Sequence, residues 1–245
     1  MGGPGDRPTS PELGLHRAKD LISRAHAVIF DVDGTLAETE EIHRQAFNTA
    51  FAKAGLEWCW DQSDYKELLR TAGGKERIRA FEGLRGEKQL LSDTAISELH
   101  RTKTAVYAEL IANGSCPLRP GIEDLLAATR RRGQRLAIAT TTSRGNIDAL
   151  LTVALGKHWI DLFAVIVAGD EVPRKKPAPD VYLEVLSRLA LPASQCVAIE
   201  DSRNGLVAAS LAGIPVLISR SAYFADDDFS DAVYVTDDLT ELAST

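Results

Sequence analysis

The chain has 245 residues, with 28 Lys and Arg against 35 Asp and Glu, so its formal net charge at pH 7 is -7. This length allows a sizeable hydrophobic core and one or two domains of ordinary size. No long run of basic residues stands out, which argues against nucleic acid as a partner. An anionic small molecule stays compatible with the acidic total, because a metal ion or a few local cations can dominate a cleft.

The cysteines and the N-terminus exclude further classes of protein. Cys59, Cys116 and Cys196 lie far apart without a C-x-x-C pair, so we expect neither a disulfide framework nor a cysteine zinc site. No apolar run approaches the roughly 18 residues of a membrane span. Residues 1–25 lack the apolar core of a secretory signal.

We therefore expect a cytoplasmic protein without membrane contact. Residues 1–25 are interpreted as an N-terminal extension that is mobile over 1–17, with a short helix over 18–25. We expect a monomer and leave a dimer open.

Short apolar, β-branched runs recur along the chain and are bounded by Gly, Pro, Asp or Ser, as is typical of parallel strands covered on both faces. Amphipathic helical patterns lie between them. This alternation predicts an α/β fold with a doubly wound parallel sheet. The strands are expected at residues 27–33, 136–142, 163–169, 196–201 and 215–219, with a weaker one at 232–237, and the helices at 121–132, 180–189 and 204–212.

Residues 40–114 interrupt this alternation, because they contain helical patterns and no comparable strand run. We interpret this insert as a mainly helical cap domain. The catalytic core would then comprise residues 26–39 and 115–245. The cap helices are expected at 43–53, 64–70 and 96–111, and the linkers at 37–41 and 113–119.

Polar motifs follow several expected strands at the sheet edge where ligands of open α/β folds bind. Asp31 and Asp33 lie at the carboxyl end of the first expected strand, and Asp201 lies at that of the fourth. Three carboxylates about 5 Å apart would repel by about 3 kcal/mol per pair at an effective dielectric of about 20. A divalent cation removes that conflict, and oxygen ligands favour Mg²⁺. The spacing does not fit a calcium-binding loop.

The segment Asp31-Val32-Asp33-Gly34-Thr35-Leu36, together with Thr140, Lys176-Pro177 and Glu200-Asp201, resembles the motifs of the haloacid dehalogenase superfamily. The resemblance covers about residues 26–220 and is to the phosphatase branch, which carries a helical cap after its first motif. It implies that Asp31 is a nucleophile that forms an aspartyl-phosphate.

The same resemblance implies roles for the other motif residues. Asp33 would be the general acid and then the base, Thr140 would hold a phosphoryl oxygen, and Lys176 would neutralise developing charge. Mg²⁺ would be held by Asp31, by the backbone carbonyl of Asp33 and by Asp201, with Glu200 supporting the site from behind.

The cap sequence resembles CbbY-type sugar-phosphate phosphatases in its Thr-Glu-Glu-x-His segment, which begins at Thr39, and in Gly-Gly-Lys-Glu-Arg-Ile, which begins at Gly73. This resemblance implies xylulose 1,5-bisphosphate as substrate, and the two glycines would let backbone amides approach a second phosphate. The candidate substrate-binding residues are Glu40, His43, Tyr65, Gly74, Lys75, Arg77, Thr141 and Thr142.

Several alternatives stay open. Tyr65 and Trp58 also suit the core of the cap, His43 a structural role, and Lys75 and Arg77 a solvated helix N-terminus. A β-phosphoglucomutase-like phosphomutase or a phosphoglycolate phosphatase would share the core motifs. An inactive metabolite-sensing domain is the non-enzymatic alternative, although retention of all the motif residues disfavours it.

Overall fold

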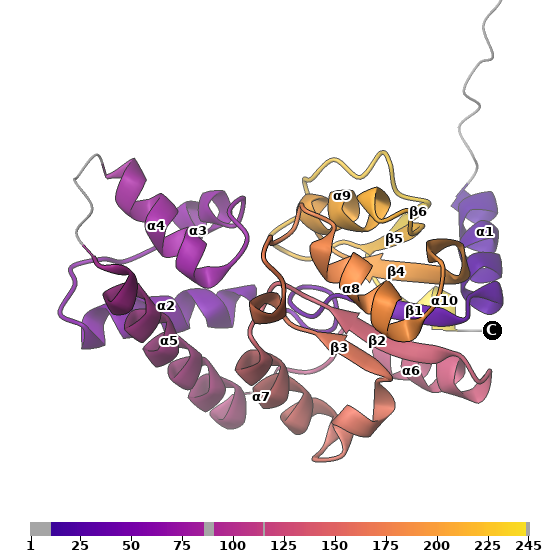
Figure 1. The fold of residues 1–245 in the computed structure, drawn as a ribbon, viewed down its shortest axis with the longest axis horizontal. Coiled ribbons are helices and arrows are strands. Elements are labelled where there is room, and N and C mark those ends of the chain that lie inside the picture. The colour runs from indigo at the N-terminus through magenta and orange to yellow at the C-terminus, as the bar shows by residue number, and fades with distance from the viewer. Residues whose placement is uncertain (1–10, 86–90, 115, 244–245) are drawn as a thin grey trace, which may run out of the picture.

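The computed structural model describes residues 11–85, 91–114 and 116–243. Six parallel strands form one sheet in the order β3-β2-β1-β4-β5-β6 (Figure 1). Phe30 at the end of β1 pairs in register with Ile138 of β2 and Ile199 of β4. The predicted doubly wound α/β fold is confirmed. The strands are β1 (Ala27–Phe30), β2 (Arg135–Ala139), β3 (Val165–Val167), β4 (Cys196–Glu200), β5 (Val216–Ser219) and β6 (Tyr234–Thr236).

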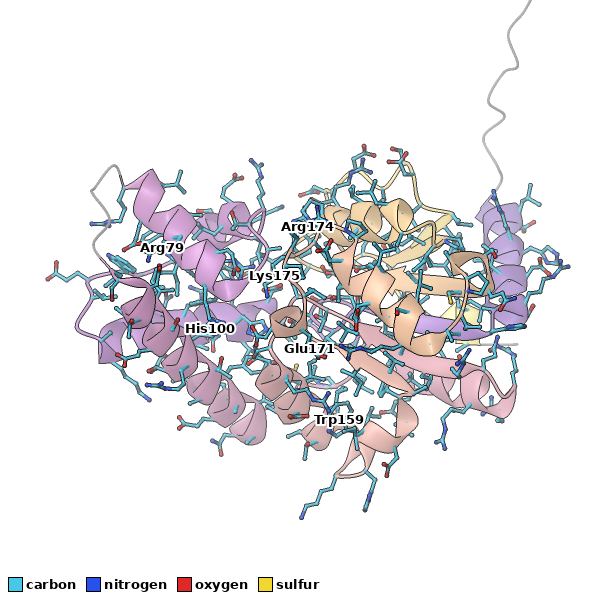
Figure 2. All side chains as sticks on the ribbon, viewed as in Figure 1. Arg79, His100, Trp159, Glu171, Arg174 and Lys175 are labelled. Atoms are coloured by element: carbon cyan, nitrogen blue, oxygen red, sulfur yellow. The ribbon has the colours of Figure 1, made fainter. Side chains whose placement is uncertain are left out.

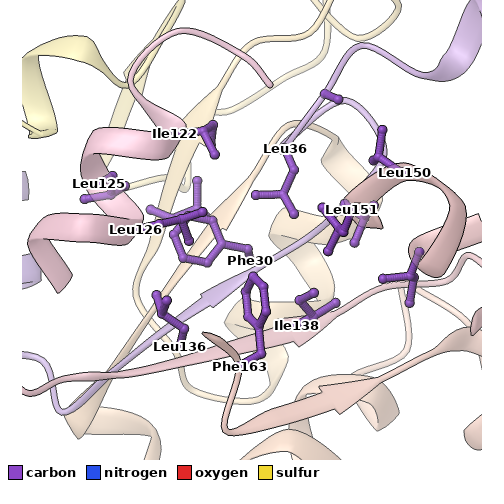
Figure 3. Packing of buried hydrophobic residues seen from close by; sticks show 14 of the residues in the cluster. Phe30, Leu36, Ile122, Leu125, Leu126, Leu136, Ile138, Leu150, Leu151 and Phe163 are labelled. Carbon is purple, nitrogen blue, oxygen red and sulfur yellow. The ribbon is translucent and has the colours of Figure 1, made fainter. Parts of the chain in front are cut away.

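Helices cover both faces of the sheet, because alternate strand residues point to opposite sides. Val28 and Phe30 face one buried cluster, whereas Ala27 and Ile29 face the other. Figure 3 shows Phe30 within the first cluster, among leucine and isoleucine side chains of helices and strands. The first face is covered by α1 (Pro11–Arg24), α6 (Ile122–Arg131), α7 (Arg144–Leu155) and α10 (Thr240–Ala243), and the second by α8 (Asp180–Leu189) and α9 (Arg203–Leu211). Three short 3₁₀ helices lie at Trp159–Leu162, Gly169–Glu171 and Ala193–Gln195.

Helix α1 corrects one expectation from the sequence. We expected a mobile segment up to residue 17, but the helix already begins at Pro11, so that expectation is wrong for residues 11–17. Leu15, Ala18 and Ile22 are spaced three and four residues apart and form an apolar stripe that packs on the first core cluster. Residues 1–10 of the expected extension lie outside the described residues.

The described part of the insert contains four helices: α2 (Glu40–Lys53), α3 (Gln62–Leu68), α4 (Gly74–Leu84) and α5 (Asp93–Asn113). They occupy the interval in which a helical cap was expected, and they enclose an aromatic cluster of their own around Phe47, Phe51 and Trp60. The two connections to the core run side by side, since Ala37 bridges Leu118 and the Arg119 N–H donates to the Leu36 carbonyl at 2.8 Å.

Within the described ranges, none of the helices combines the length and the apolarity that crossing a bilayer requires.

Candidate active site

A cavity lies between the cap and the carboxyl ends of the strands, and its wall collects most of the residues that the sequence singled out. Two of the candidates, Tyr65 and Glu200, are not on this wall. The core contributes Asp31, Asp33, Thr140, Thr141, Thr142, Lys176 and Asp201, and the cap contributes Glu40, His43, Gly74, Lys75 and Arg77.

Asp31 lies at the base of the cavity, directly after β1. Its backbone N–H donates to the Ile199 carbonyl at 3.0 Å, which extends the pairing with β4 by one residue. Lys176 donates from Nζ to Asp31 Oδ1 at 2.6 Å. Burial raises the pKa of Asp31 to about 7, with Lys176 opposing and Glu200 adding to the rise. A carboxylate that is poorly solvated and held by one ammonium is a suitable nucleophile.

Lys176 joins Asp31 to a second carboxylate behind the cavity. Its Nζ also donates to Glu200 Oε1 at 2.5 Å and to the Ala139 carbonyl at 2.9 Å, and the Tyr182 hydroxyl donates to the same Glu200 oxygen. Burial lowers the pKa of Lys176, but the two carboxylates outweigh it and hold the pKa above its usual value. Lys176 is therefore charged beside Asp31.

Glu200 is fully buried and supports the site from behind. A Cβ at position 205 would lie 1.9 Å from Glu200 Oε2, so the glycine at the start of α9 leaves the space that this carboxylate fills. With Lys176 and Tyr182 as donors, Glu200 fixes the ammonium group that faces Asp31.

Asp31, Glu200 and Asp201 form a cluster of three buried carboxylates whose oxygens lie within 4.8 Å of one another. Asp201 accepts from the Thr35 hydroxyl at Oδ1 (3.2 Å) and from the Ser221 hydroxyl at Oδ2 (2.7 Å). Burial, together with the charges of Asp31 and Glu200, raises the pKa of Asp201 well above its usual value. Lys176 offsets the charges of Asp31 and Glu200, but no cationic side chain of the described residues forms an ion pair with Asp201, and an all-oxygen set of this kind fits a hard divalent cation.

The turn after β1 fits closely against this cluster. Gly34 has a φ of 81°, and a Cβ there would lie 2.0 Å from Asp201 Oδ2. Only glycine adopts this backbone conformation readily and leaves that space free. The turn of the Asp-x-Asp-Gly-Thr motif is therefore in contact with Asp201.

The expectation that the side chains of Asp31, Asp33 and Asp201 form the carboxylate cluster is wrong for Asp33. Glu200 is the third member, and Asp33 instead contacts Thr39 and His43. Asp33 Oδ1 accepts from the Thr39 hydroxyl at 2.6 Å and lies 2.9 Å from His43 Nε2. Burial raises the pKa of Asp33, but His43 and Thr39 outweigh it, with a smaller contribution from Lys103, and hold the pKa well below its usual range. The two aspartates of the motif thus have opposite electrostatic environments, which is typical of a pair with separate roles.

Lys103 of α5 was not found from the sequence. Its Nζ lies 2.6 Å from His43 Nδ1, so with Nδ1 accepting, His43 donates its Nε2–H to Asp33. The imidazole also stacks on Tyr107 at 4.2 Å. Lys103 is 3% exposed. Its position between Leu99 and Tyr107 on the buried stripe of a predicted helix is the signal that would have identified it.

Tyr65 requires a correction, because it does not reach the cavity. It is fully buried in the aromatic cluster of the cap, where its ring packs against Phe47 and Trp60. Its hydroxyl donates to Glu40 Oε2 at 2.8 Å and accepts from Arg77 at 2.9 Å. Tyr65 therefore holds two residues of the wall from behind, and the alternative placement in the cap core is the one observed.

Arg77 and Lys75 differ in how their charges are engaged. Arg77 is 8% exposed, and besides Tyr65 it donates to the carbonyls of Leu68 and Thr71. Lys75 is exposed on the same wall, and no hydrogen bond or ion pair joins its ammonium group to another described residue. Of the two cations, Lys75 is the one whose charge is available to a ligand.

Two further residues, His100 and Lys175, line the cavity from the cap and from the core respectively (Figure 2). His100 was not found from the sequence, and Lys175 was considered there only as an alternative to its neighbour Lys176. Burial lowers the pKa of His100 to about 3, with Lys103 and Lys75 adding to the effect, so its imidazole is neutral. Lysines from both sides therefore surround the cavity, which favours an anionic ligand.

Comparison with known proteins agrees with this geometry. Residues 25–213 match the model of the haloacid dehalogenase-like hydrolases. The chain is 52% identical to Protein CbbY of Rhodobacter capsulatus over 218 residues, which cover 89% of this chain and 95% of that protein.

Solved structures extend the comparison. CbbY from Rhodobacter sphaeroides in complex with phosphate superposes with a TM-score of 0.84 at 48% identity, over 89% of this chain and 96% of that one. A variant of the same protein in complex with xylulose 1,5-bisphosphate also gives a TM-score of 0.84, at 47% identity and with the same coverage. A β-phosphoglucomutase from Clostridium difficile shares the fold at 22% identity and a TM-score of 0.74.

The fold and the site define a hydrolase of the α/β type whose chemistry is centred on carboxylates. The chain belongs to the haloacid dehalogenase-like hydrolase family, as a CbbY-like phosphatase.

Proposed function

We propose that this protein is a Mg²⁺-dependent phosphatase that hydrolyses a small sugar phosphate or bisphosphate through an aspartyl-phosphate on Asp31, with xylulose 1,5-bisphosphate as the preferred candidate substrate. The observation that carries the proposal is the arrangement of Asp31 between Lys176 and Asp201 at the base of a cavity walled by lysines. The bisphosphate bound to the similar CbbY structure supports the choice of substrate.

Mg²⁺ would be held by Asp31, Asp201 and the backbone carbonyl of Asp33. When bound, it supplies positive charge that offsets the clustered carboxylates and the substrate phosphate. Glu200 supports the site through Lys176 and does not line the cavity.

The first half of the reaction forms a bond between a carboxylate oxygen of Asp31 and phosphorus, while the bond from phosphorus to the sugar oxygen breaks. Asp33 gives its proton to that oxygen, so the sugar leaves as an alcohol. Lys176 neutralises charge on Asp31 and on the transferring phosphoryl group. Thr140 lies just before the N-terminus of α7, where a hydroxyl and backbone N–H groups can hold phosphoryl oxygens.

In the second half, Asp33 takes a proton from water as the water oxygen attacks phosphorus, and Asp31 is released with inorganic phosphate. The contacts from His43 and Thr39 favour the ionised Asp33 that this step requires. The first half requires the protonated form, and the negative charge of an entering phosphate favours it. Closure of the cap over the cavity would exclude bulk water from both steps.

A bisphosphate needs a second anion-binding site, away from the carboxylate cluster. Lys75 is the candidate to contact it, because its charge is not engaged by other described residues and it stands beside Gly74 on the cavity wall. Arg77 contributes long-range positive charge and holds Tyr65 and thereby Glu40.

Phosphate release with and without Mg²⁺, measured across sugar mono- and bisphosphates, tests the proposal. The Asp31→Asn variant should lose more than about ten-thousandfold in kcat while keeping the wild-type far-UV circular dichroism spectrum and melting temperature. Covalent labelling by phosphate in the wild type and not in the variant would identify the aspartyl-phosphate. Undiminished turnover in the variant would contradict the assignment of Asp31.

The second anion site is tested by comparing substrates. Lys75→Ala should raise KM for the bisphosphate about tenfold, the loss of one charge-assisted contact, and leave KM for the matching monophosphate within about twofold. Arg77→Ala is the comparison variant and should impair both substrates, because it also disturbs the packing around Tyr65. Equal losses for both substrates with Lys75→Ala would place the second phosphate elsewhere.

The phosphomutase alternative is separated by its products. A phosphatase releases inorganic phosphate in a one-to-one ratio with substrate consumed, and phosphorus NMR should detect no isomeric sugar phosphate. Accumulation of an isomer would favour the mutase. Phosphoglycolate belongs in the same screen, and a kcat/KM for it above that for every sugar phosphate would favour the phosphoglycolate phosphatase alternative.

A further inference from the structure

Arg119 lies in the connection from the cap back to the core and has no part in the mechanism above. Its side chain is 8% exposed, and it does not line the cavity. A guanidinium group has five N–H donors in a fixed planar arrangement. In Arg119, Nη1 donates to the carbonyls of Gly34 and Ser219 and Nη2 to those of Arg220 and Asp237, while Nε forms an ion pair with Glu38 Oε1 at 3.3 Å.

Two of these acceptors, Gly34 and Arg220, directly precede the two residues whose hydroxyl groups donate to Asp201. Gly34 directly precedes Thr35, whose hydroxyl donates to Asp201 Oδ1. Arg220 directly precedes Ser221, whose hydroxyl donates to Asp201 Oδ2. The two segments are separated by more than 180 residues of sequence, and one guanidinium group joins them.

We propose that Arg119 is a positioning residue for Asp201: by fixing the turn at Gly34 and the end of β5 relative to each other, it sets the orientation of the Asp201 carboxylate from both sides. This inference rests on the proposed Mg²⁺ site, of which Asp201 is a ligand. The turn needs this restraint because Gly34 stands in close contact with Asp201 Oδ2, and a small movement of the turn would displace that oxygen.

A lysine at position 119 would keep the positive charge and lose the planar arrangement of donors that the guanidinium group provides. Its single ammonium group has three donors on a flexible stem and cannot hold five acceptors in one plane. Residues that orient a metal ligand typically change metal affinity or activity by about tenfold to a hundredfold when they are replaced. We therefore expect Arg119→Lys to weaken Mg²⁺ binding by at least about tenfold, through Asp201 and without any contact to substrate.

A merely structural role for Arg119 predicts a different result. In that case Arg119→Lys would lower the melting temperature, and the folded fraction would bind Mg²⁺ as the wild type does. At saturating Mg²⁺, our proposal expects a lower kcat with a KM for substrate that stays within about twofold, because the cap residues of the cavity wall are unchanged.

The test is isothermal titration calorimetry with Mg²⁺ alone, on the full chain, for the wild type, Arg119→Lys and a control. Arg220→Lys is the matched control, because Arg220 is an arginine close to this network whose exposed side chain pairs, among the described residues, only with Asp237 at the surface. The control should bind Mg²⁺ as the wild type does. If the wild type itself shows no Mg²⁺ binding, the proposed function fails; wild-type binding by a folded Arg119→Lys overturns the role of Arg119 alone.

Two further variants keep the proposal testable if Arg119→Lys does not fold. Ser221→Ala and Thr35→Val each remove one of the hydroxyl contacts to Asp201 through which Arg119 is proposed to act. Each should weaken Mg²⁺ binding by about tenfold, and where Arg119→Lys folds, combining it with Ser221→Ala should give less than the product of the two effects. Unchanged Mg²⁺ affinity in both hydroxyl variants would overturn the proposal, whatever Arg119→Lys does.

Discussion

The core side and the cap side of the cavity hold their charged groups in different ways. On the core side, Lys176 is bonded to Asp31 and Glu200, so opposite charges meet in a closed, buried network. On the cap side, Lys103 is buried against His43 and two aromatic rings, and no carboxylate of the described residues forms an ion pair with it. The core side is therefore organised before substrate arrives, whereas the cap side keeps positive charge that an anionic substrate can satisfy.

Breaking the core network should have the larger effect. Lys176→Met removes the cation between two buried carboxylates, which should lower the free energy of unfolding by about 3–5 kcal/mol and kcat by at least about a hundredfold. Urea unfolding and phosphate release measure the two effects. Lys175→Met is the matched control: among the described residues, the Lys175 ammonium group donates to the Gly169 carbonyl and lies 4.0 Å from Asp170 Oδ1, so the free energy of unfolding should change by less than about 1 kcal/mol.

In the cap, by contrast, replacing a buried lysine is expected to raise the free energy of unfolding. Burial lowers the pKa of Lys103 from 10.5 to about 7. Between these values the unfolded chain binds more protons than the folded one, so this lysine destabilises the fold fully below pH 7 and not at all above about 10.5. Lys103→Met should therefore be more stable than the wild type at pH 7 and below, and the difference should vanish as the pH rises.

Urea unfolding of both proteins across this pH range measures the effect of Lys103. The same variant should lose activity, because His43 then lacks the group that fixes its ring beside Asp33. A stability difference that does not change with pH would mean that Lys103 keeps an ordinary pKa in the folded protein.

The smallest effect on stability is expected for an exposed ion pair between the cap and the core. Lys66 of α3 pairs with Asp226 of the core at 2.9 Å, but the two side chains are 46% and 85% exposed. A double-mutant cycle with Lys66→Ala and Asp226→Ala should give a coupling free energy below about 1 kcal/mol. A larger coupling would mean that this pair contributes substantially to holding the cap against the core.

The sequence predicted the core better than the cap, and the reason is physical. A parallel strand buried on both faces needs a run of apolar residues, and the motif residues must follow where such a strand ends, so position along the chain fixes position in space for Asp31, Thr140 and Asp201. The long insert could be recognised as helical for the same reason, since it lacks such runs.

The contacts within the cap were harder to predict, because they depend on how helices pack against one another. Tyr65 has a polar end that suits either a ligand or a neighbouring side chain, and only the packing of α2 against α3 and α4 assigns it to Glu40 and Arg77. Helix α1 was missed in part because its many charged residues obscure a stripe formed by the three apolar residues Leu15, Ala18 and Ile22. Arg119 contacts mostly backbone carbonyls, which have no signature in the sequence.

The side-by-side course of the two connections, marked by the bridge between Ala37 and Leu118, means that the insert leaves and rejoins the sheet domain at nearly one point. An engineered chain in which a short turn replaces the whole insert would therefore keep the geometry of the remaining strands without stretching the backbone. In such a shortened protein, the reactivity of the aspartates could be measured without the substrate selectivity that the cap adds. It also suggests how unrelated cap domains could be exchanged on one catalytic core.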